Sequence, residues 1–250
     1  MSDTELLKIE DLSFGVDVEG GDQGKEIIRG INLIVPAGRL VVITGPNGGG
    51  KSTLARLIAG IEKPTTGKIY FDGEDITEKS VTDRARAGIG FAFQQPVRFK
   101  GLMVKDLIRL AKGGEIKPAE VCDYLGAVGL CANDYMDREV DSSLSGGELK
   151  RIEIATVLAK GSKLSVFDEP EAGIDLWSFK SLIEVFRGMR SDIRDSSIII
   201  ISHQERILDI ADEIVVIRDG CVADGGTKEE ILPGLIGTAS AVSACRQVKA

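Results

Sequence analysis

Long apolar runs are missing from this sequence. No stretch reaches the roughly 18 consecutive apolar residues that a membrane-spanning helix needs, so no membrane span is expected. The acidic first ten residues also lack the apolar core of a signal peptide, which argues against secretion. The sequence therefore predicts a cytoplasmic protein.

Blocks of basic residues are missing as well. The 31 lysines and arginines are outnumbered by 39 aspartates and glutamates, which gives a formal net charge of −8. Proteins that hold nucleic acid usually present a basic surface to the phosphate backbone. We therefore expect no nucleic-acid partner, and the acidic balance is expected to keep the protein in solution.

Metal-binding motifs are sparse. The four cysteines, Cys122, Cys131, Cys221 and Cys245, are widely spaced and form no C-x-x-C pair, which weakens a zinc or redox interpretation. Reduced thiols of a cytoplasmic protein are favoured, and a thiol role in metal chemistry is the remaining alternative. Histidine occurs once, as His203.

Short buried strands that alternate with helices are what the sequence does contain. Three apolar runs, "RLVVIT", "KLSVFDE" and "SIIIIS", predict buried strands, although Ser165 interrupts the second. Apolar residues at helical spacing follow the first run (Leu54, Leu57 and Ile58) and the second (Phe179, Leu182, Ile183 and Phe186). The pattern predicts an α/β protein with a parallel sheet covered on both faces.

Other segments flank this core. Strands are predicted in 6–16 and 26–35 around a polar loop, and "DEIVVIRDGCVADGG" predicts a hairpin that turns at Asp219 and Gly220. Residues from about 104 to 160 have helical patterns. We expect one domain over 5–235, with a core at about 5–95 and 160–235 and a helical subdomain at about 96–159. The small and polar C-terminal tail, 236–250, is expected to be poorly ordered.

A glycine-rich stretch carries the clearest chemistry. It fits G-x-x-x-x-G-K-[ST] at every fixed position and lies between a buried strand and a helix. Such a loop turns successive backbone N–H groups toward phosphate, while its lysine contacts the β and γ oxygens and its serine binds magnesium. The predicted nucleotide-binding residues here are Gly45, Pro46, Asn47, Gly48, Gly49, Gly50, Lys51, Ser52 and Thr53.

Two acids follow the second buried strand. Taken alone, Asp168 and Glu169 would be read as a solvated turn, but beside a phosphate loop they suggest a magnesium-binding acid and a residue that orients water. His203 follows the third strand, and the carboxyl ends of parallel strands meet at the ligand edge of such a sheet. Gln94, in "FAFQQP", would be an ordinary loop residue if it stood alone.

A second candidate anion site is the stretch "LSGGELKR". Ser145 and Glu148 have the spacing of a helix capping box, and Gly146 and Gly147 leave the helix end free of side chains. The exposed N–H groups of such an end attract anions. An ordinary capped helix is the alternative interpretation, and the two can coexist.

The motifs together resemble those of ATP-binding-cassette (ABC) ATPases. "GPNGGGKST", "FAFQQP", "LSGGE", "VFDEP", "AGID" and "SHQ" occur in that family's order, over roughly residues 7–232. The resemblance implies a P-loop NTPase fold of the ABC type, with a RecA-like core, an N-terminal antiparallel β subdomain and an inserted α-helical subdomain. It also implies an ATPase that uses ATP and Mg²⁺, in a head-to-tail homodimer whose signature helices close on the partner's phosphates.

The resemblance also implies roles for single residues. Glu169 is expected as the general base, His203 as the switch histidine, and Gln94 as a magnesium ligand that contacts a partner-facing loop, with Ser52 and Asp168 as further metal ligands. Leu144 to Gly147 would form the signature, with Ser145, Gly146 and Gly147 as its nucleotide-binding residues, and Asp175 would belong to a loop at the dimer interface. The usual aromatic residue that stacks on adenine is replaced near Val16, which leaves the choice between ATP and GTP open.

Two kinds of ABC ATPase fit this pattern. "FAFQQPV", "LSGGELKRIEI", "AGID" and "SHQERIL" are closer to the SufC-like ATPase of SUF iron–sulfur cluster assembly, whose partner is a SufB/SufD-like scaffold protein. Pro170 after Glu169, and the loop "VRFKGLMV", are closer to ATP-binding subunits that drive a transporter permease from the membrane periphery. The SUF-like interpretation is favoured here. A nucleotide-gated scaffold with little turnover ranks third, because Glu169 and His203 are both present.

Overall fold

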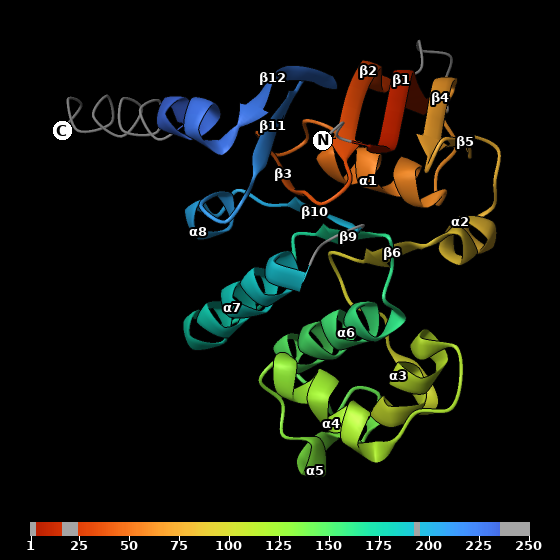
Figure 1. Cartoon of the computed structure of the whole chain (residues 1–250), viewed down its shortest axis with the longest axis vertical. Helices are drawn as coiled ribbons and strands as arrows, with labels where there is room; N and C mark the ends of the chain where they lie inside the picture. The colour runs from red at the N-terminus through yellow and green to blue at the C-terminus, as the bar shows by residue number, and fades with distance from the viewer. Residues whose placement is uncertain (1–3, 17–24, 193–195, 236–250) are drawn as a thin grey trace.

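The computed structural model describes residues 4–16, 25–192 and 196–235. Its centre is a sheet in the order β12-β11-β3-β10-β9-β6, in which β11 to β6 run parallel and β12 runs antiparallel to β11 (Figure 1). The strands are β3 (Leu40–Thr44), β6 (Ile89–Ala92), β9 (Leu164–Asp168), β10 (Ser197–Ile201), β11 (Glu213–Arg218) and β12 (Cys221–Thr227). The predicted hairpin is therefore present, with Asp219 and Gly220 at positive φ in its turn.

Apolar layers cover both faces of the central sheet. In β3, Leu40 and Val42 pack into a cluster with α6 (Gly146–Lys160) and α7 (Leu176–Asp192), while Val41 and Ile43 pack into a second cluster with α1 (Lys51–Ala59). Successive side chains of a strand point to opposite faces, so a strand buried on both sides needs a continuous apolar run. The short α8 (Glu205–Leu208) follows β10. The predicted α/β fold is confirmed.

A separate antiparallel sheet packs over α1. Its order is β2-β1-β4-β5, formed by β1 (Glu5–Val16), β2 (Lys25–Pro36), β4 (Thr66–Phe71) and β5 (Glu74–Asp75), and α2 (Val81–Ala87) follows it. The predicted strands at 6–16 and 26–35 are present, and most of the loop between them lies outside the described residues. The two sheets share one apolar cluster, so the N-terminal strands and the glycine loop are packed as one unit.

The helical part projects below the sheets in Figure 1. It contains α3 (Val104–Lys112), α4 (Pro118–Ala127), α5 (Ala132–Tyr135) and α6. The sequence patterns predicted only helices here, but β7 (Phe99–Met103) also pairs with β8 (Glu139–Val140) in a short ribbon. The borders placed at 96 and 159 remain a prediction, and the predicted tail 236–250 lies outside the described residues. Among the described helices, none is both long and apolar enough to cross a membrane.

A buried arginine fixes the end of the helix that follows the glycine loop. Arg84 of α2 is 1% exposed and donates hydrogen bonds to the carbonyls of Leu57 and Ile58 in α1, at 2.7 and 3.0 Å. It also donates to the carbonyls of Thr77 and Lys79. A cation is favourable at the C-terminus of a helix because the last carbonyls there lack helical partners. Arg84 therefore holds α1, and with it the loop, in place.

Candidate functional site

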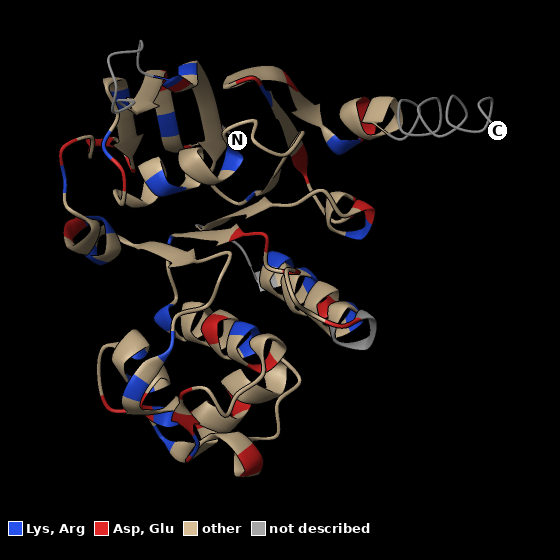
Figure 2. Cartoon of the chain, turned by 180° about the vertical axis from the view of Figure 1, so that it is seen from behind, with Lys and Arg blue, Asp and Glu red and all other residues tan. Residues whose placement is uncertain are grey.

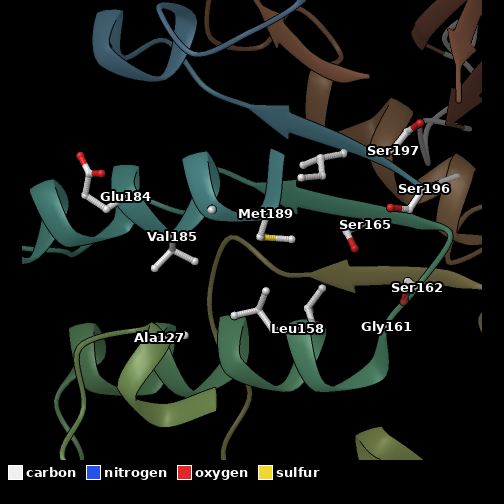
Figure 3. Close-up of a pocket in the computed structure, with 13 residues that line it drawn as sticks. Ala127, Leu158, Gly161, Ser162, Ser165, Glu184, Val185, Met189, Ser196 and Ser197 are labelled. Atoms are coloured by element: carbon white, nitrogen blue, oxygen red, sulfur yellow. The ribbon is translucent and has the colours of Figure 1, made fainter. Parts of the chain in front are cut away.

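Two large cavities differ in their lining. One, of about 490 Å³, lies between α6, α7 and the amino ends of β9 and β10. Figure 3 shows that its walls carry serines and apolar side chains, and the one charged residue among its described lining residues is Glu184. The other, of about 720 Å³, is a cleft lined by the glycine loop together with the basic residues Lys25, Arg29 and Lys51. Only the second lining suits a phosphate chain.

The glycine loop folds tightly against neighbouring backbone. Gly45, Gly48 and Gly50 all have positive φ, at 133°, 77° and 103°. A Cβ at Gly45 would lie 2.0 Å from the carbonyl oxygen of Ile217 in β11, so no side chain fits there. The Gly49 carbonyl accepts a hydrogen bond from the Gly220 N–H at 3.1 Å. The C-terminal hairpin therefore supports the loop from behind.

Lys51 lies inside this loop. It is 6% exposed, and its ammonium donates hydrogen bonds to the carbonyls of Gly45 and Pro46, both at 2.9 Å. Burial lowers the pKa of Lys51, while the nearby carboxylates of Glu169 and Asp168 oppose that shift. The donors of the lysine are therefore directed at loop oxygens, where phosphate oxygens would compete for them.

Oxygen ligands gather where α1 and β9 meet. The Ser52 hydroxyl donates a hydrogen bond to Oδ1 of Asp168 at 2.9 Å, and Asp168 is 2% exposed. Burial raises the pKa of Asp168, and the hydrogen bond from Ser52 counteracts this. A buried carboxylate and a hydroxyl are hard oxygen donors, the kind that Mg²⁺ prefers. The pair therefore fits a magnesium ion bound with substrate phosphates.

Glu169 and Gln94 meet across the carboxyl ends of two strands. Glu169 follows β9 with a φ of 44°, and its N–H donates to the Ile201 carbonyl of β10 at 3.0 Å. Its Oε2 accepts a hydrogen bond from the side-chain amide of Gln94, which follows β6, at 2.5 Å. Both residues line the cleft. The sequence-predicted base and glutamine are thus brought together at the ligand edge of the sheet.

His203 follows β10, as the sequence suggested, and the structure leaves it exposed. The residue before it makes a contact that the sequence did not suggest, because the Ser202 hydroxyl donates to Oε1 of Glu171 at 2.5 Å. Burial raises the pKa of Glu171. The only sequence feature that could have indicated this hydrogen bond is the acid Glu171, two positions after Glu169. This bond ties the strand end that carries His203 to the loop that follows β9.

The signature helix begins as predicted. Ser145 caps α6, its hydroxyl accepts the Glu148 N–H, and Oε2 of Glu148 accepts the Ser145 N–H at 2.7 Å. The Tyr135 hydroxyl also donates to Glu148 at 2.5 Å, and this bond is the main reason why the pKa of Glu148 falls to about 2. A Cβ at Gly147 would lie 3.5 Å from the Gly173 carbonyl, so the signature lies against the loop before α7.

None of the signature residues is among the described residues that line the glycine-loop cleft. Asp175 lies in the loop between β9 and α7, where its carbonyl accepts the Phe179 N–H. Val16 ends β1 with a 41% exposed side chain and does not line the cleft, whereas Lys25, its partner on β2, does. One chain therefore presents two candidate phosphate-binding surfaces that do not meet.

The sequence model of a family described as ABC transporter matches residues 28–172. This chain belongs to the ABC transporter family. The match begins in β2 and ends after the acid pair, so it includes the glycine loop, the glutamine and the signature. The chain is the ATP-binding cassette of that family, and it is an ATPase that hydrolyses ATP.

Relatives of the cassette carry transporter names. It is 41% identical over 234 residues to an uncharacterized ABC transporter ATP-binding protein of Methanocaldococcus jannaschii, covering 90% of both chains. It is 32% identical to a probable ATP-dependent transporter of Cyanophora paradoxa, again over 90% of each. A sulfate/thiosulfate import ATP-binding protein of Bacillus cereus is 34% identical over 82% of this chain, which spans 58% of that longer protein.

Solved structures share the fold. A dimeric ATP-binding cassette with bound ADP and phosphate superposes with a TM-score of 0.80 at 21% identity, over 89% of this chain and 98% of that one. A bacterial Atm1-family ABC exporter with ATP bound has a TM-score of 0.78 at 29% identity, over 91% of this chain and 40% of the exporter. The ABC-type fold expected from the motifs is confirmed.

The comparisons correct the finer expectation. They give the SUF-like interpretation no support, and they favour the transporter subunit that the motifs ranked second. The residues that suggested SUF lie within short nucleotide-site motifs, and a few side chains in such motifs separate subfamilies poorly. The sequence reasoning also missed Lys25 and Arg29, which reach the cleft from β2 and belong to no motif.

Proposed function

We propose that this cassette works as a head-to-tail pair that hydrolyses ATP at two shared sites and thereby drives a membrane transporter. The observation that carries the proposal is the division of the site. The cleft holds the glycine loop, Lys51 and Glu169, while the capped end of α6 with Gly146 and Gly147 lies outside it. A second copy would supply the missing anion-binding end.

The residues in and beside the glycine-loop cleft have separate chemical tasks in the proposed reaction. The loop N–H groups and Lys51 bind the β- and γ-phosphates, and Glu169 accepts a hydrogen bond from the attacking water and orients it. Ser52, Asp168 and Gln94 would hold Mg²⁺, which neutralises charge on the phosphate oxygens when bound.

The remaining predicted residues lie around this centre. Ser145 and the two signature glycines would contact the γ-phosphate bound by the other copy, and Asp175 would lie at the interface between copies. His203 would sense the γ-phosphate from the end of β10. Val16 would lie beside the adenine ring of the nucleotide, next to Lys25, its partner on β2.

An apolar groove beside Gln94 supports a partner that moves with hydrolysis. Phe93, Val97 and Phe99 are 39%, 46% and 42% exposed, and a groove of about 160 Å³ lies among them and apolar residues of α6. Exposed apolar patches of this kind mark interaction sites, and a groove suits an amphipathic helix. A transporter partner would hold the cassette at the membrane periphery.

Charge and metal chemistry supply no argument for cluster assembly. Basic and acidic residues are interspersed along the helices in Figure 2. Within the described part of the chain, no group of three or more His, Cys, Asp or Glu residues could hold a metal ion. The described cysteines, Cys122, Cys131 and Cys221, are exposed and unpaired in disulfides.

A mixed dimer tests the shared sites. Ser145→Arg places bulk and charge in the proposed γ-phosphate gap, so a copy carrying it should block hydrolysis in the opposite copy. The opposite copy is marked by a separate tag, and the Ser145→Arg copy also carries Lys51→Ala so that only one site can turn over. Undiminished hydrolysis at the marked site would contradict the head-to-tail arrangement.

Cross-linking tests the partner. A photoreactive residue at Val97, in the exposed groove, should capture a multi-span membrane protein in cells that express the full chain. The matched control places the same group at Val81, which is exposed to 47% on α2, outside the groove. Capture of a soluble β-rich scaffold from Val97 would instead support the SUF-like interpretation.

A further inference from the structure

Two charged side chains of the signature helix hold one residue of the core by its backbone. Oε1 of Glu153 accepts a hydrogen bond from the Phe93 N–H at 2.9 Å, and the Lys150 ammonium donates to the Phe93 carbonyl. The two side chains also pair with each other, with Nζ of Lys150 3.2 Å from Oε2 of Glu153. Phe93 follows β6 and directly precedes Gln94.

Both charges are withdrawn from water. The Lys150 side chain is 0% exposed and that of Glu153 is 14% exposed. Burial raises the pKa of Glu153, and Lys150 opposes that shift. A buried ion pair contributes little net stability, because desolvation cancels most of the attraction, so apolar residues could fill the same space at least as well. What apolar residues could not do is bind the N–H and the carbonyl of Phe93.

The contact of Lys150 and Glu153 with Phe93 lies on a continuous path from the signature to Gln94. Ser145 to Gly147 begin α6, and Lys150 and Glu153 follow within its next two turns. From there the path runs through the Phe93 backbone to Gln94, whose amide donates to Glu169 at 2.5 Å. A helix is stiff over this length, so a shift of the signature end moves the point at which Phe93 is held.

We propose that Lys150 and Glu153 are positioning residues for ATP hydrolysis. By holding the Phe93 backbone they set where the Gln94 amide stands relative to Glu169, and they tie that geometry to the signature end of the same helix. The inference rests on the proposed roles of Gln94 and Glu169, and it does not depend on which partner the cassette drives.

The test removes the contact without leaving an unpaired charge. Lys150→Met with Glu153→Leu replaces both side chains by apolar ones of similar size, which avoids the large loss of stability that follows when one partner of a buried pair is removed. Because misplacement of a positioned group by about 1 Å costs up to ~10²-fold in rate, we expect kcat to fall by about 10- to 100-fold. The KM for ATP should change by less than about threefold, since the Lys51 loop is untouched.

A lysine at the other end of the same helix supplies the matched control. Lys160 donates to the Ile89 carbonyl at 2.7 Å, so it too binds a β6 carbonyl, but at the strand end far from Gln94. Lys160→Met should leave kcat unchanged. Hydrogen exchange at the Phe93 amide should accelerate in the double variant and not in Lys160→Met, which reports the contact independently of hydrolysis.

A double-mutant cycle with Gln94→Ala separates an effect on the position of Gln94 from a general loss of structure. If the pair acts through Gln94, the double variant should lower kcat little further once Gln94 is already Ala. Wild-type kcat in a folded double variant would overturn the inference. So would a combined variant in which the fold-loss of kcat equals the product of the losses of the double variant and of Gln94→Ala.

Two further results complete the test. If the double variant does not fold, Glu153→Gln takes its place. A neutral amide oxygen accepts from the Phe93 N–H more weakly than a carboxylate does, so hydrogen exchange at Phe93 should accelerate and kcat should fall by a smaller factor. Accelerated exchange at Phe93 with wild-type kcat would refute the inference. If Gln94→Ala alone keeps wild-type kcat, the proposed role of Gln94 fails and the positioning inference falls with it.

Discussion

A single methyl group at Gly45 tests the geometry of the phosphate loop. The Cβ of Gly45→Ala would stand 2.0 Å from the Ile217 carbonyl oxygen, whereas ordinary contact begins at 3.4 Å. Backbone must therefore move by about 1.4 Å, and overpacking of this kind typically costs about 1–3 kcal/mol. The positive φ adds about 1–2 kcal/mol for a residue with a side chain. Gly48→Ala is the matched control, because its φ of 77° is also positive while its Cβ would meet nothing within 4 Å.

Urea unfolding without nucleotide measures the difference between the two variants in the free energy of unfolding. Gly45→Ala should be less stable than Gly48→Ala by about 1–3 kcal/mol, which at slopes of roughly 3 kcal/mol/M lowers the midpoint by about 0.3–1 M. Calorimetry should also show a larger loss of ATP affinity for Gly45→Ala, since the displaced backbone carries the phosphate-binding N–H groups. Equal midpoints for the two variants would refute the packing of the loop against β11.

Three further outcomes follow from the site. Glu169→Gln should bind ATP and accumulate as an ATP-bound dimer while steady-state turnover falls by about 10²–10⁴, so unchanged turnover would remove the residue from its proposed role. Lys51→Ala should abolish tight nucleotide binding, and wild-type affinity in calorimetry would contradict the loop assignment. Glu148→Gln should lower the urea midpoint at pH 7, because the pKa of Glu148 is depressed from 4.5 to about 2 by Tyr135 and the capped backbone. That difference should shrink as the pH falls from about 4.5 toward 2, and a difference independent of pH would show that the carboxylate charge does not matter there.

The sequence was sufficient wherever a local pattern determines structure. Buried strands appear as apolar runs, the capping box of Ser145 and Glu148 is a three-residue spacing, and Asp219 with Gly220 forms the turn that such a pair favours. The glycine loop could be placed because a strand, a loop and a helix follow one another without interruption. In each case the determining contacts lie within a few residues along the chain.

The rest depends on contacts between distant segments. The pairing of β7 with β8 joins residues about forty apart in sequence, and no apolar period marks it. Arg84 and Lys150 read as surface cations in a charged helical pattern, yet each is buried on main-chain carbonyls of another element. The nucleotide motifs describe the ATP site and not the partner, which is why they favoured the SUF-like interpretation that the comparisons do not support.

The position of β3 has a consequence for how the protein is made. The strand that leads into the phosphate loop pairs only with β10 and β11 among the described strands, and Gly45 packs on Ile217. A ribosome completes the glycine loop well before it makes β10 and β11, the two strands that flank β3. The nascent chain thus carries the glycine loop before the strands that shape it exist, so it can bind nucleotide only after β11 has been made and has paired with β3.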